Sequence, residues 1–183
     1  VPALGANTVR SEFGFLAGVD ESLLGAHKFN PYESVLKGCQ VESLPLLLKR
    51  LGYRSICIHP YSSSFYCRDR VFPMLGIDEF IDINAFDGAE RSGHYVNDAA
   101  VADKILEVLA AAEKPTFVFA ITMENHGPLH LEVVVDGDVE RFYESNLPAG
   151  FGDLTVYLRH LKNADQMITR LTQVFDQMDA PVS

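Results

Sequence analysis

Two histidines stand where apolar, strand-like runs of the sequence end. His59 closes the run RSICIHP, and His126 follows the run PTFVFAITM within the stretch ENHGP, next to Asn125. Functional groups gather at the carboxyl ends of strands in parallel sheets, so both histidines are candidates for a site. A single loop histidine is more often a bystander than a functional group, whereas two histidines at two strand ends support a site; an ordinary turn stays the alternative.

A hydroxyl near the start of the chain is a third candidate. Thr8 follows the letters GAN and precedes an apolar periodicity of Phe13, Leu16 and Ala17, which predicts a helix that begins at or beside Thr8. Backbone N–H groups and the helix dipole favour an anion at such a terminus. Thr8 could therefore be a nucleophile whose phosphorylated form is stabilised there. A plain N-cap is the more common role for a hydroxyl in this position.

The segment HPYSSSFYCRDR adds a cation and an aromatic ring soon after His59. Arg68 could fork onto a phosphate, with Tyr66 beside it, or it could be a solvated charge on a helix. The remaining histidines lack a comparable context and are expected at the surface, with the last of them exposed on a long helix: His27, His94, His130 and His160.

The elements that must position these residues alternate between helix and strand. Helices are predicted over 43–52, 62–76, 97–112 and 152–178, and strands over 53–60, 78–83 and 115–123. Residues 84–95 and 129–150 lack a pattern and are expected to form loops or small hairpins. The alternation predicts an α/β layered fold with a mainly parallel sheet, in a single domain over residues 1–183.

Composition excludes several classes of function. The net charge is −10 and no Lys/Arg cluster is present, so we expect no nucleic-acid partner. The three cysteines have neither metal-site nor disulfide-framework spacing, and Cys57 reads as a small core residue. No run approaches the roughly 20 apolar residues of a membrane span. A membrane link is therefore expected only through parts that this sequence does not contain.

Four stretches taken together resemble the signatures of a known family. They are GANTVRSEFGFLAG, SLPLLLKRLGY, HPYSSSFYCRDRVFPMLGIDEFID and ITMENHGP. In this order, over about two thirds of the chain, they resemble the lipoteichoic-acid-synthase-like phosphoglycerol transferases, in the sulfatase branch of the alkaline phosphatase superfamily. The long helix after Gly152 resembles one in the same family. The resemblance implies a three-layer α/β sandwich, alkaline-phosphatase/sulfatase-like, that is incomplete at both ends here.

The resemblance also implies roles for single residues. Thr8 matches the nucleophilic threonine, which in the family is also a ligand of the catalytic divalent metal. Three residues are expected to contact the substrate. His59 matches a histidine of the substrate pocket, and Arg68 matches an arginine that holds the phosphate or glycerol group. Tyr66 stands where some members carry Trp. His126 matches a catalytic histidine near the phosphoryl group, and Asn125 is taken with it as substrate-binding.

The sequence departs from the family's pattern in its metal ligands. A glutamate on a strand before the nucleophile and a late Gly–Asp–His are both missing, which leaves Thr8 alone of the metal set. We therefore expect a central fragment of a catalytic domain that binds little metal and turns over little, whereas the complete protein would use Mn, Mg or Zn. The Cys-x-Pro-x-Arg run of true sulfatases is also absent, which disfavours sulfate-ester hydrolysis.

The resemblance implies a phosphoryl-transfer enzyme of cell-envelope or capsular polysaccharide assembly. The donor would be a phosphoglycerol lipid or another phosphodiester, and the acceptor would be a glycan. The enzyme would be located in the cell envelope, anchored to the membrane, with an extracytoplasmic catalytic domain. A cytoplasmic location is the alternative. A phosphodiesterase or phosphatase-type hydrolase is one alternative function, and a non-catalytic α/β binding module is another. We expect His59 and His126 on one edge of the sheet, with Thr8 facing them across a cleft.

Overall fold

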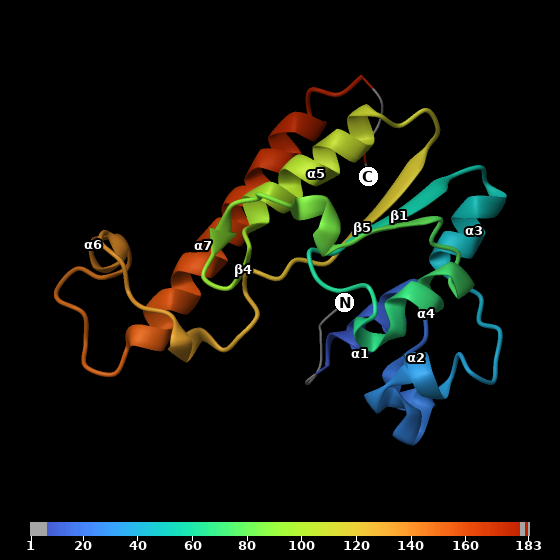
Figure 1. Ribbon diagram of the computed structural model, residues 1–183, viewed down its shortest axis with the longest axis horizontal. Coiled ribbons are helices and arrows are strands. Elements are labelled where there is room, and N and C mark those ends of the chain that lie inside the picture. The colour runs from blue at the N-terminus through green and yellow to red at the C-terminus, as the bar shows by residue number, and fades with distance from the viewer. Residues whose placement is uncertain (1–6, 180–181, 183) are drawn as a thin grey trace. The chain divides into compact units, whose positions relative to one another are not determined.

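The computed structural model describes residues 7–179 and residue 182 (Figure 1). The chain forms two compact units, which are described separately. The first unit comprises residues 1–85 and 111–121, and the second comprises residues 86–110 and 122–183. The expectation of one domain over residues 1–183 therefore stays a prediction.

The first unit consists of helices and a parallel sheet. Its elements, with η for 3-10 helices, are α1 (Thr8–Ala17), η1 (Glu21–Phe29), α2 (Pro31–Ser34), α3 (Leu44–Arg50), β1 (Arg54–Ile58), η2 (Phe65–Cys67), α4 (Arg68–Met74), β2 (Glu79–Ile81) and β5 (Thr116–Ala120). The helix η3 (Ile83–Phe86) covers the point in the sequence where the first unit gives way to the second.

The sheet of the first unit has the order β2-β1-β5, and both pairings are parallel. Ile58, the last residue of β1, pairs with Ile81 of β2 and with Ala120 of β5. The three strands therefore end at the same edge. Four of the five residues of β1 are buried, as expected for the central strand of a parallel sheet with a continuous apolar sequence.

Local sequence signals explain where α3 and α4 begin and end. Ser43 caps α3 by accepting a hydrogen bond from the Leu46 backbone, and Pro45 lies in its first turn. Gly52 follows the helix with a φ of 87°, which favours glycine. Pro73 lies inside α4, one residue before its end, where a proline stops a helix from continuing.

The core of the first unit is formed by one face of α1 against α2, α4 and the sheet. Val9, Phe13 and Leu16 recur at helical spacing and are buried. They join a cluster whose other members are Tyr32, Leu36, Cys57, Val71, Phe72, Leu75 and Ile77. The thiol of Cys57 is fully buried in this cluster, which confirms its prediction as a core residue.

The second unit pairs two long helices with a small hairpin. Its elements are β3 (Arg91–Ser92), β4 (Tyr95–Val96), α5 (Asp98–Ala110), η4 (Leu129–Leu131), α6 (Asp138–Phe142) and α7 (Gly152–Phe175). Helices α5 and α7 run side by side (Figure 1). The antiparallel β3–β4 pair is a small hairpin at the end of residues 84–95, one of the two forms expected there. Residues 129–150 are mainly loop, as the other expected form has it, with η4 and α6 as short helical turns within it.

Helix α7 buries only part of the apolar stripe that its sequence carries. The stripe consists of Leu154, Leu158, Leu161, Ile168, Leu171, Phe175 and Met178. Leu171 is buried, as this stripe predicts, but Leu154, Leu161 and Ile168 are between 44% and 55% exposed. The prediction that His160 is exposed is wrong, because its side chain is completely buried. Asp153 lies within the first turn of α7, and Phe151 occupies its cap position.

Among the described residues, no helix combines the length and the apolar character that crossing a bilayer requires.

The first residue of α5 is a fully buried carboxylate. Asn97 caps this helix by accepting from the Ala100 backbone, and Asp98 follows inside. Burial, and then the negative charge of Glu124, raise the pKa of Asp98 from 3.8 to about 6, although Thr122 and His160 oppose the shift. The folded second unit therefore favours the protonated form of Asp98.

The Asp98→Asn substitution should stabilise the protein at neutral pH. Because the pKa of Asp98 is higher in the folded state, its favourable contribution is complete below pH 3.8 and is lost as the pH rises through about 6. A shift of about 2 units corresponds to about 3 kcal/mol. The gain of the variant over wild type should therefore grow by about that amount between pH 4 and pH 8, as measured by urea unfolding. A difference that does not change with pH would contradict the burial argument.

Candidate active site

The carboxyl edge of the first unit's sheet carries His59. The His59 backbone N–H donates to Ile81 at the end of β2, at 2.9 Å, so the residue continues the strand ladder. Its ring Nδ1 lies 2.8 Å from the Ile121 carbonyl oxygen, just past the end of β5. The side chain is 2% exposed. Three parallel strands thus hold this imidazole in one place.

The partners of His59 define its tautomer. A carbonyl oxygen only accepts, so Nδ1 carries a hydrogen and donates it to Ile121. The other ring nitrogen, Nε2, faces the Nη1 of Arg68 at 3.4 Å, and a guanidinium only donates. In the neutral ring, Nε2 is therefore the acceptor. Imidazole and guanidinium form one hydrogen-bonded chain.

Arg68 is buried, not solvated. It is the first residue of α4 and is 1% exposed. Its Nε donates to Glu12 Oε2 at 3.0 Å and its Nη2 to Glu12 Oε1 at 2.5 Å, which is a bidentate pair. The two guanidinium nitrogens of Arg68 that could bind a phosphate side by side are thus bound to the carboxylate of Glu12 on α1. The third nitrogen, Nη1, lies 3.4 Å from both His59 and the Phe65 carbonyl oxygen.

The carboxylate of Glu12 has a second donor beside Arg68. The Tyr32 hydroxyl donates to Glu12 Oε2 at 2.9 Å. Burial, reinforced by the charge of Glu12, raises the pKa of Tyr32 well above 10, so its hydroxyl remains a donor. Burial lowers the pKa of Arg68, but the hydrogen bond and charge of Glu12 more than compensate and the pKa is raised. The guanidinium of Arg68 therefore stays charged.

A strained turn places Arg68 and Tyr66. Tyr66 and Cys67 both have φ 55°, a left-handed conformation that costs about 1–2 kcal/mol for a residue with a Cβ. The turn puts the Tyr66 ring 5.1 Å and the Phe65 ring 5.9 Å from the Arg68 guanidinium carbon. Cation–π attraction of this kind supports the buried charge. Such strain is typical of a functional site.

Thr8 is exposed and is the first residue of α1. It stands four residues before Glu12, so both lie on the same stripe of the helix. Asn7 occupies the cap position, with φ 75° and no capping side-chain bond, so the plain N-cap alternative for Thr8 is not what the structure shows. Gly5 and Ala6 lie outside the described residues. The Thr8 hydroxyl is thus placed at the positive end of the helix dipole.

The donor groups for a metal ion are few here. Within residues 7–179, no group of three or more His, Cys, Asp or Glu side chains is arranged to hold one. Thr8 supplies one hydroxyl, and the nearby carboxylate of Glu12 is already bound to Arg68 and Tyr32. The described residues therefore do not by themselves fit a divalent cation.

His126 and Asn125 belong to the second unit. His126 is exposed, with Nδ1 2.7 Å from the Gly127 carbonyl oxygen and its ring edge-on to Tyr95 at 5.6 Å. Asn125 donates to the backbone oxygen of His160 at 3.4 Å, which ties the turn to α7. Because these residues lie in a different unit from His59 and Thr8, the expected common edge and cleft stay predictions.

The second unit contains a buried polar cluster that was not predicted from the sequence. Glu124 accepts from the Asp98 backbone at 2.7 Å, from Asn163 at 2.5 Å and from His160 Nδ1 at 3.0 Å. The other ring nitrogen of His160 lies 3.0 Å from Glu132. A helical spacing in the sequence could have indicated it, because Val156, His160, Asn163, Met167 and Leu171 follow one face of α7.

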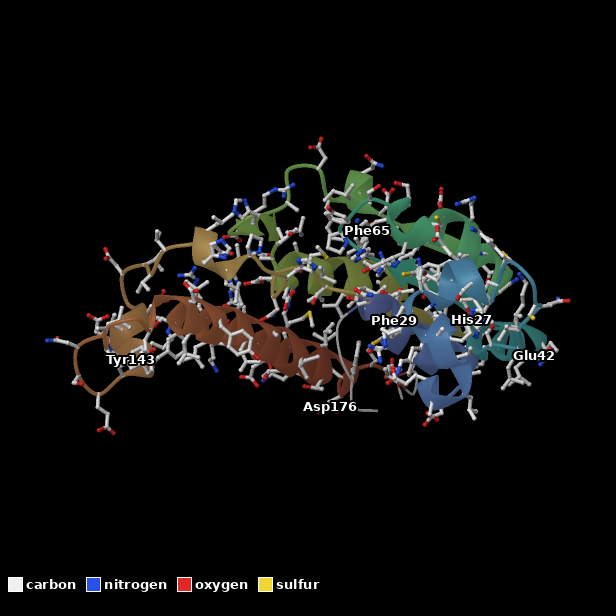
Figure 2. All side chains as sticks on the ribbon, turned by 90° about the horizontal axis from the view of Figure 1, so that it is seen from below. His27, Phe29, Glu42, Phe65, Tyr143 and Asp176 are labelled. Carbon is white, nitrogen blue, oxygen red and sulfur yellow. The ribbon has the colours of Figure 1, made fainter. Side chains whose placement is uncertain are left out.

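The ends of this cluster fix the loop before α7. Arg159 pairs with Glu132 at 3.2 Å and with Asp138 at 2.6 Å. The Tyr143 hydroxyl lies 2.8 Å from Thr155 Oγ1, and Figure 2 shows Tyr143 beside the start of α7. The cluster thus stabilises the second unit by holding the loop against α7. Three predicted surface histidines are exposed: His27, His94 and His130.

Known proteins are similar to this chain in sequence and in fold. The family described as Sulfatase matches residues 2–182. The capsular polysaccharide biosynthesis protein RkpI of Rhizobium meliloti (strain 1021) is 32% identical over 187 residues, which cover 97% of this chain and 31% of that protein. The chain thus spans about a third of the length of this relative.

Solved structures agree on the fold. The lipoteichoic acid synthase LtaP of Listeria monocytogenes superposes with a TM-score of 0.71 at 22% identity, over 94% of this chain and 41% of that one. The Streptococcus pyogenes phosphoglycerol transferase GacH, solved with sn-glycerol-1-phosphate, superposes with a TM-score of 0.71 at 22% identity. The superposition covers 97% of this chain and 46% of that one. These likenesses confirm the α/β class with a parallel sheet of the alkaline-phosphatase/sulfatase type.

The match along nearly the whole chain, together with these relatives and folds, shows that the chain belongs to the sulfatase family and resembles its lipoteichoic-acid-synthase-like members.

Proposed function

We propose that the complete protein is a phosphoryl-transfer enzyme of the phosphoglycerol transferase type, acting in cell-envelope or capsular polysaccharide assembly. Family membership supports an enzyme of this class, and two relatives are named for capsular polysaccharide biosynthesis and phosphoglycerol transfer. The observation that carries the proposal is the exposed hydroxyl of Thr8 at the helix terminus, one turn before the buried Glu12–Arg68–His59 chain.

The proposed chemistry is a double displacement at phosphorus. Thr8 Oγ attacks the phosphorus of a phosphoglycerol lipid, the Oγ–P bond forms, and the bond from phosphorus to the oxygen of the diacylglycerol breaks. The diacylglycerol oxygen takes up the proton that the Thr8 hydroxyl gives up, and glycerol phosphate stays on Thr8. A hydroxyl of the glycan acceptor then attacks the phosphorus, the Oγ–P bond breaks, and Thr8 Oγ takes up the proton that the acceptor gives up. His59, Arg68, Tyr66 and Asn125 are proposed to bind the substrate, and His126 to assist at the phosphoryl oxygens.

A divalent metal is part of the proposal for the complete protein. Thr8 would be one of its ligands, and the others would come from parts of the protein beyond these residues. When bound, Mn, Mg or Zn would lower the pKa of a hydroxyl and neutralise phosphate charge. A lipid donor also implies a membrane-anchored protein with an extracytoplasmic catalytic domain, which we propose as its location.

The Thr8→Ala substitution should abolish transfer in the full-length protein. No covalent intermediate can form without the hydroxyl, so the rate should fall by about three or more orders of magnitude. Thr8→Ser keeps a hydroxyl and should retain part of the activity. The assay is transfer of labelled glycerol phosphate from phosphatidylglycerol vesicles to a glycan acceptor, with thermal unfolding as the control for folding.

Three outcomes of this assay separate the candidate functions. A Thr8→Ala protein that is stable and transfers at the normal rate would remove Thr8 as nucleophile. Release of free glycerol phosphate without any transfer to a hydroxyl acceptor would favour the hydrolase. A full-length protein with neither activity would favour the non-catalytic binding module.

The His126→Ala substitution should slow the reaction without removing the covalent route. Loss of a positioned proton-transfer or charge-stabilising group costs about 100- to 10,000-fold, while Thr8 can still carry the glycerol phosphate. His130→Ala is the matched control, because His130 is another exposed histidine of the same loop region. Equal activity of the two variants in the transfer assay would remove His126 from the catalytic set.

A further inference from the structure

The carboxylate of Glu12 has no role in the chemistry proposed so far, yet it is buried and fully engaged in hydrogen bonds. It is 3% exposed and receives three hydrogen bonds, two from Arg68 and one from Tyr32. Burying an ion pair is expensive, and the cost is repaid only by good geometry. The bidentate contact supplies that geometry, but an apolar pair would stabilise the core as well.

The contact with Glu12 determines which nitrogen of the Arg68 guanidinium can bind other groups. Nε and Nη2 both point at the carboxylate, so only the Nη1 edge is directed elsewhere. That edge faces His59 Nε2 and the Phe65 carbonyl oxygen, each at 3.4 Å. A guanidinium is rigid and planar, so fixing two nitrogens fixes the third.

The hydrogen bonds form a continuous series across the carboxyl edge of the sheet. Glu12 on α1 holds Arg68 on α4, Arg68 faces His59 after β1, and His59 donates to Ile121 after β5. Thr8 lies on the same helix as Glu12, one turn earlier. The orientation of α1 is therefore coupled to the position of the imidazole.

We propose that Glu12 is a positioning residue, which clamps Arg68 so that its Nη1 edge and the His59 ring hold a fixed place relative to the helix that carries Thr8. Glu12 touches no reacting atom in this account. It acts through Arg68 alone. The inference rests on the proposed function for its kinetic test, but not for its structural one.

The Glu12→Asp variant separates positioning from charge compensation. Aspartate keeps the buried negative charge, so a purely structural role is satisfied and the thermal midpoint should stay close to wild type. Its side chain is one methylene shorter, so it should draw the guanidinium toward α1. In a crystal structure of the variant, the Nη1 to His59 Nε2 distance should exceed about 3.5 Å, the limit of a hydrogen bond. A variant in which Arg68 still contacts His59 as before would overturn the proposal.

The kinetic arm uses the full-length enzyme and its transfer of glycerol phosphate from phosphatidylglycerol vesicles. Glu12→Asp should lower kcat/KM about 10- to 100-fold, as loss of an outer partner does for metal-binding side chains. In an Arg68→Met background, which removes the clamped group, the same substitution should change kcat/KM less than about twofold, because the two effects are not independent. Equal losses in both backgrounds would overturn the proposal.

Glu21→Asp is the matched control. Glu21 also pairs with an arginine of α1, Arg10, at 2.5 Å, but it is 30% exposed. Its shortening should leave kcat/KM within about twofold. If wild type transfers no glycerol phosphate, the proposed function fails, and the crystal structure of Glu12→Asp still decides the role of Glu12.

Discussion

The buried ion pair between Glu12 and Arg68 is the constraint on which the first unit's candidate site depends. Both residues are almost fully excluded from solvent, since Glu12 is 3% exposed and Arg68 is 1% exposed. Removing either one would leave an unpaired buried charge, which costs about 3–5 kcal/mol. The pair therefore obliges α1 and α4 to stay in register with each other. The strained turn at Tyr66 and Cys67 is maintained because Arg68 has to reach this position.

Local signals in the sequence were sufficient for most elements of the fold. Ser43 and Asn97 stand at the start of two predicted helices, and each caps its helix. The apolar runs around Cys57 and Phe119 form adjacent parallel strands. Each of these features depends on residues that are close in sequence. The same holds for Thr8 at the first position of α1, because an apolar periodicity marks where that helix starts.

The contacts that matter most to the site were not predictable in the same way. Glu12 and Arg68 are 56 residues apart, and nothing near either one marks it as a buried partner of the other. His160 was misplaced because the leucines around it suggested another buried face of α7. A histidine bridging Glu124 and Glu132 reverses that preference, since two buried carboxylates require a donor between them.

Side chains with polar roles therefore fall into two groups. Glu124, His160 and Glu132 stabilise the loop and helix of the second unit by satisfying one another. Glu12, Arg68 and His59 also satisfy one another, but they lie at the carboxyl edge of a parallel sheet, beside a helix whose exposed first residue is a threonine. Position in the fold, and not burial or charge alone, distinguishes the candidate site from the structural cluster.

The most direct test of the account is to trap the covalent intermediate. The full-length enzyme would be incubated with phosphatidylglycerol in the absence of an acceptor, quenched in acid and digested, and the peptide that contains Thr8 examined by mass spectrometry. The account predicts one glycerol phosphate group on the Thr8 hydroxyl, which disappears when an acceptor is added before quenching. Turnover with the group on another residue, or with no modified peptide at any time during the reaction, would contradict it.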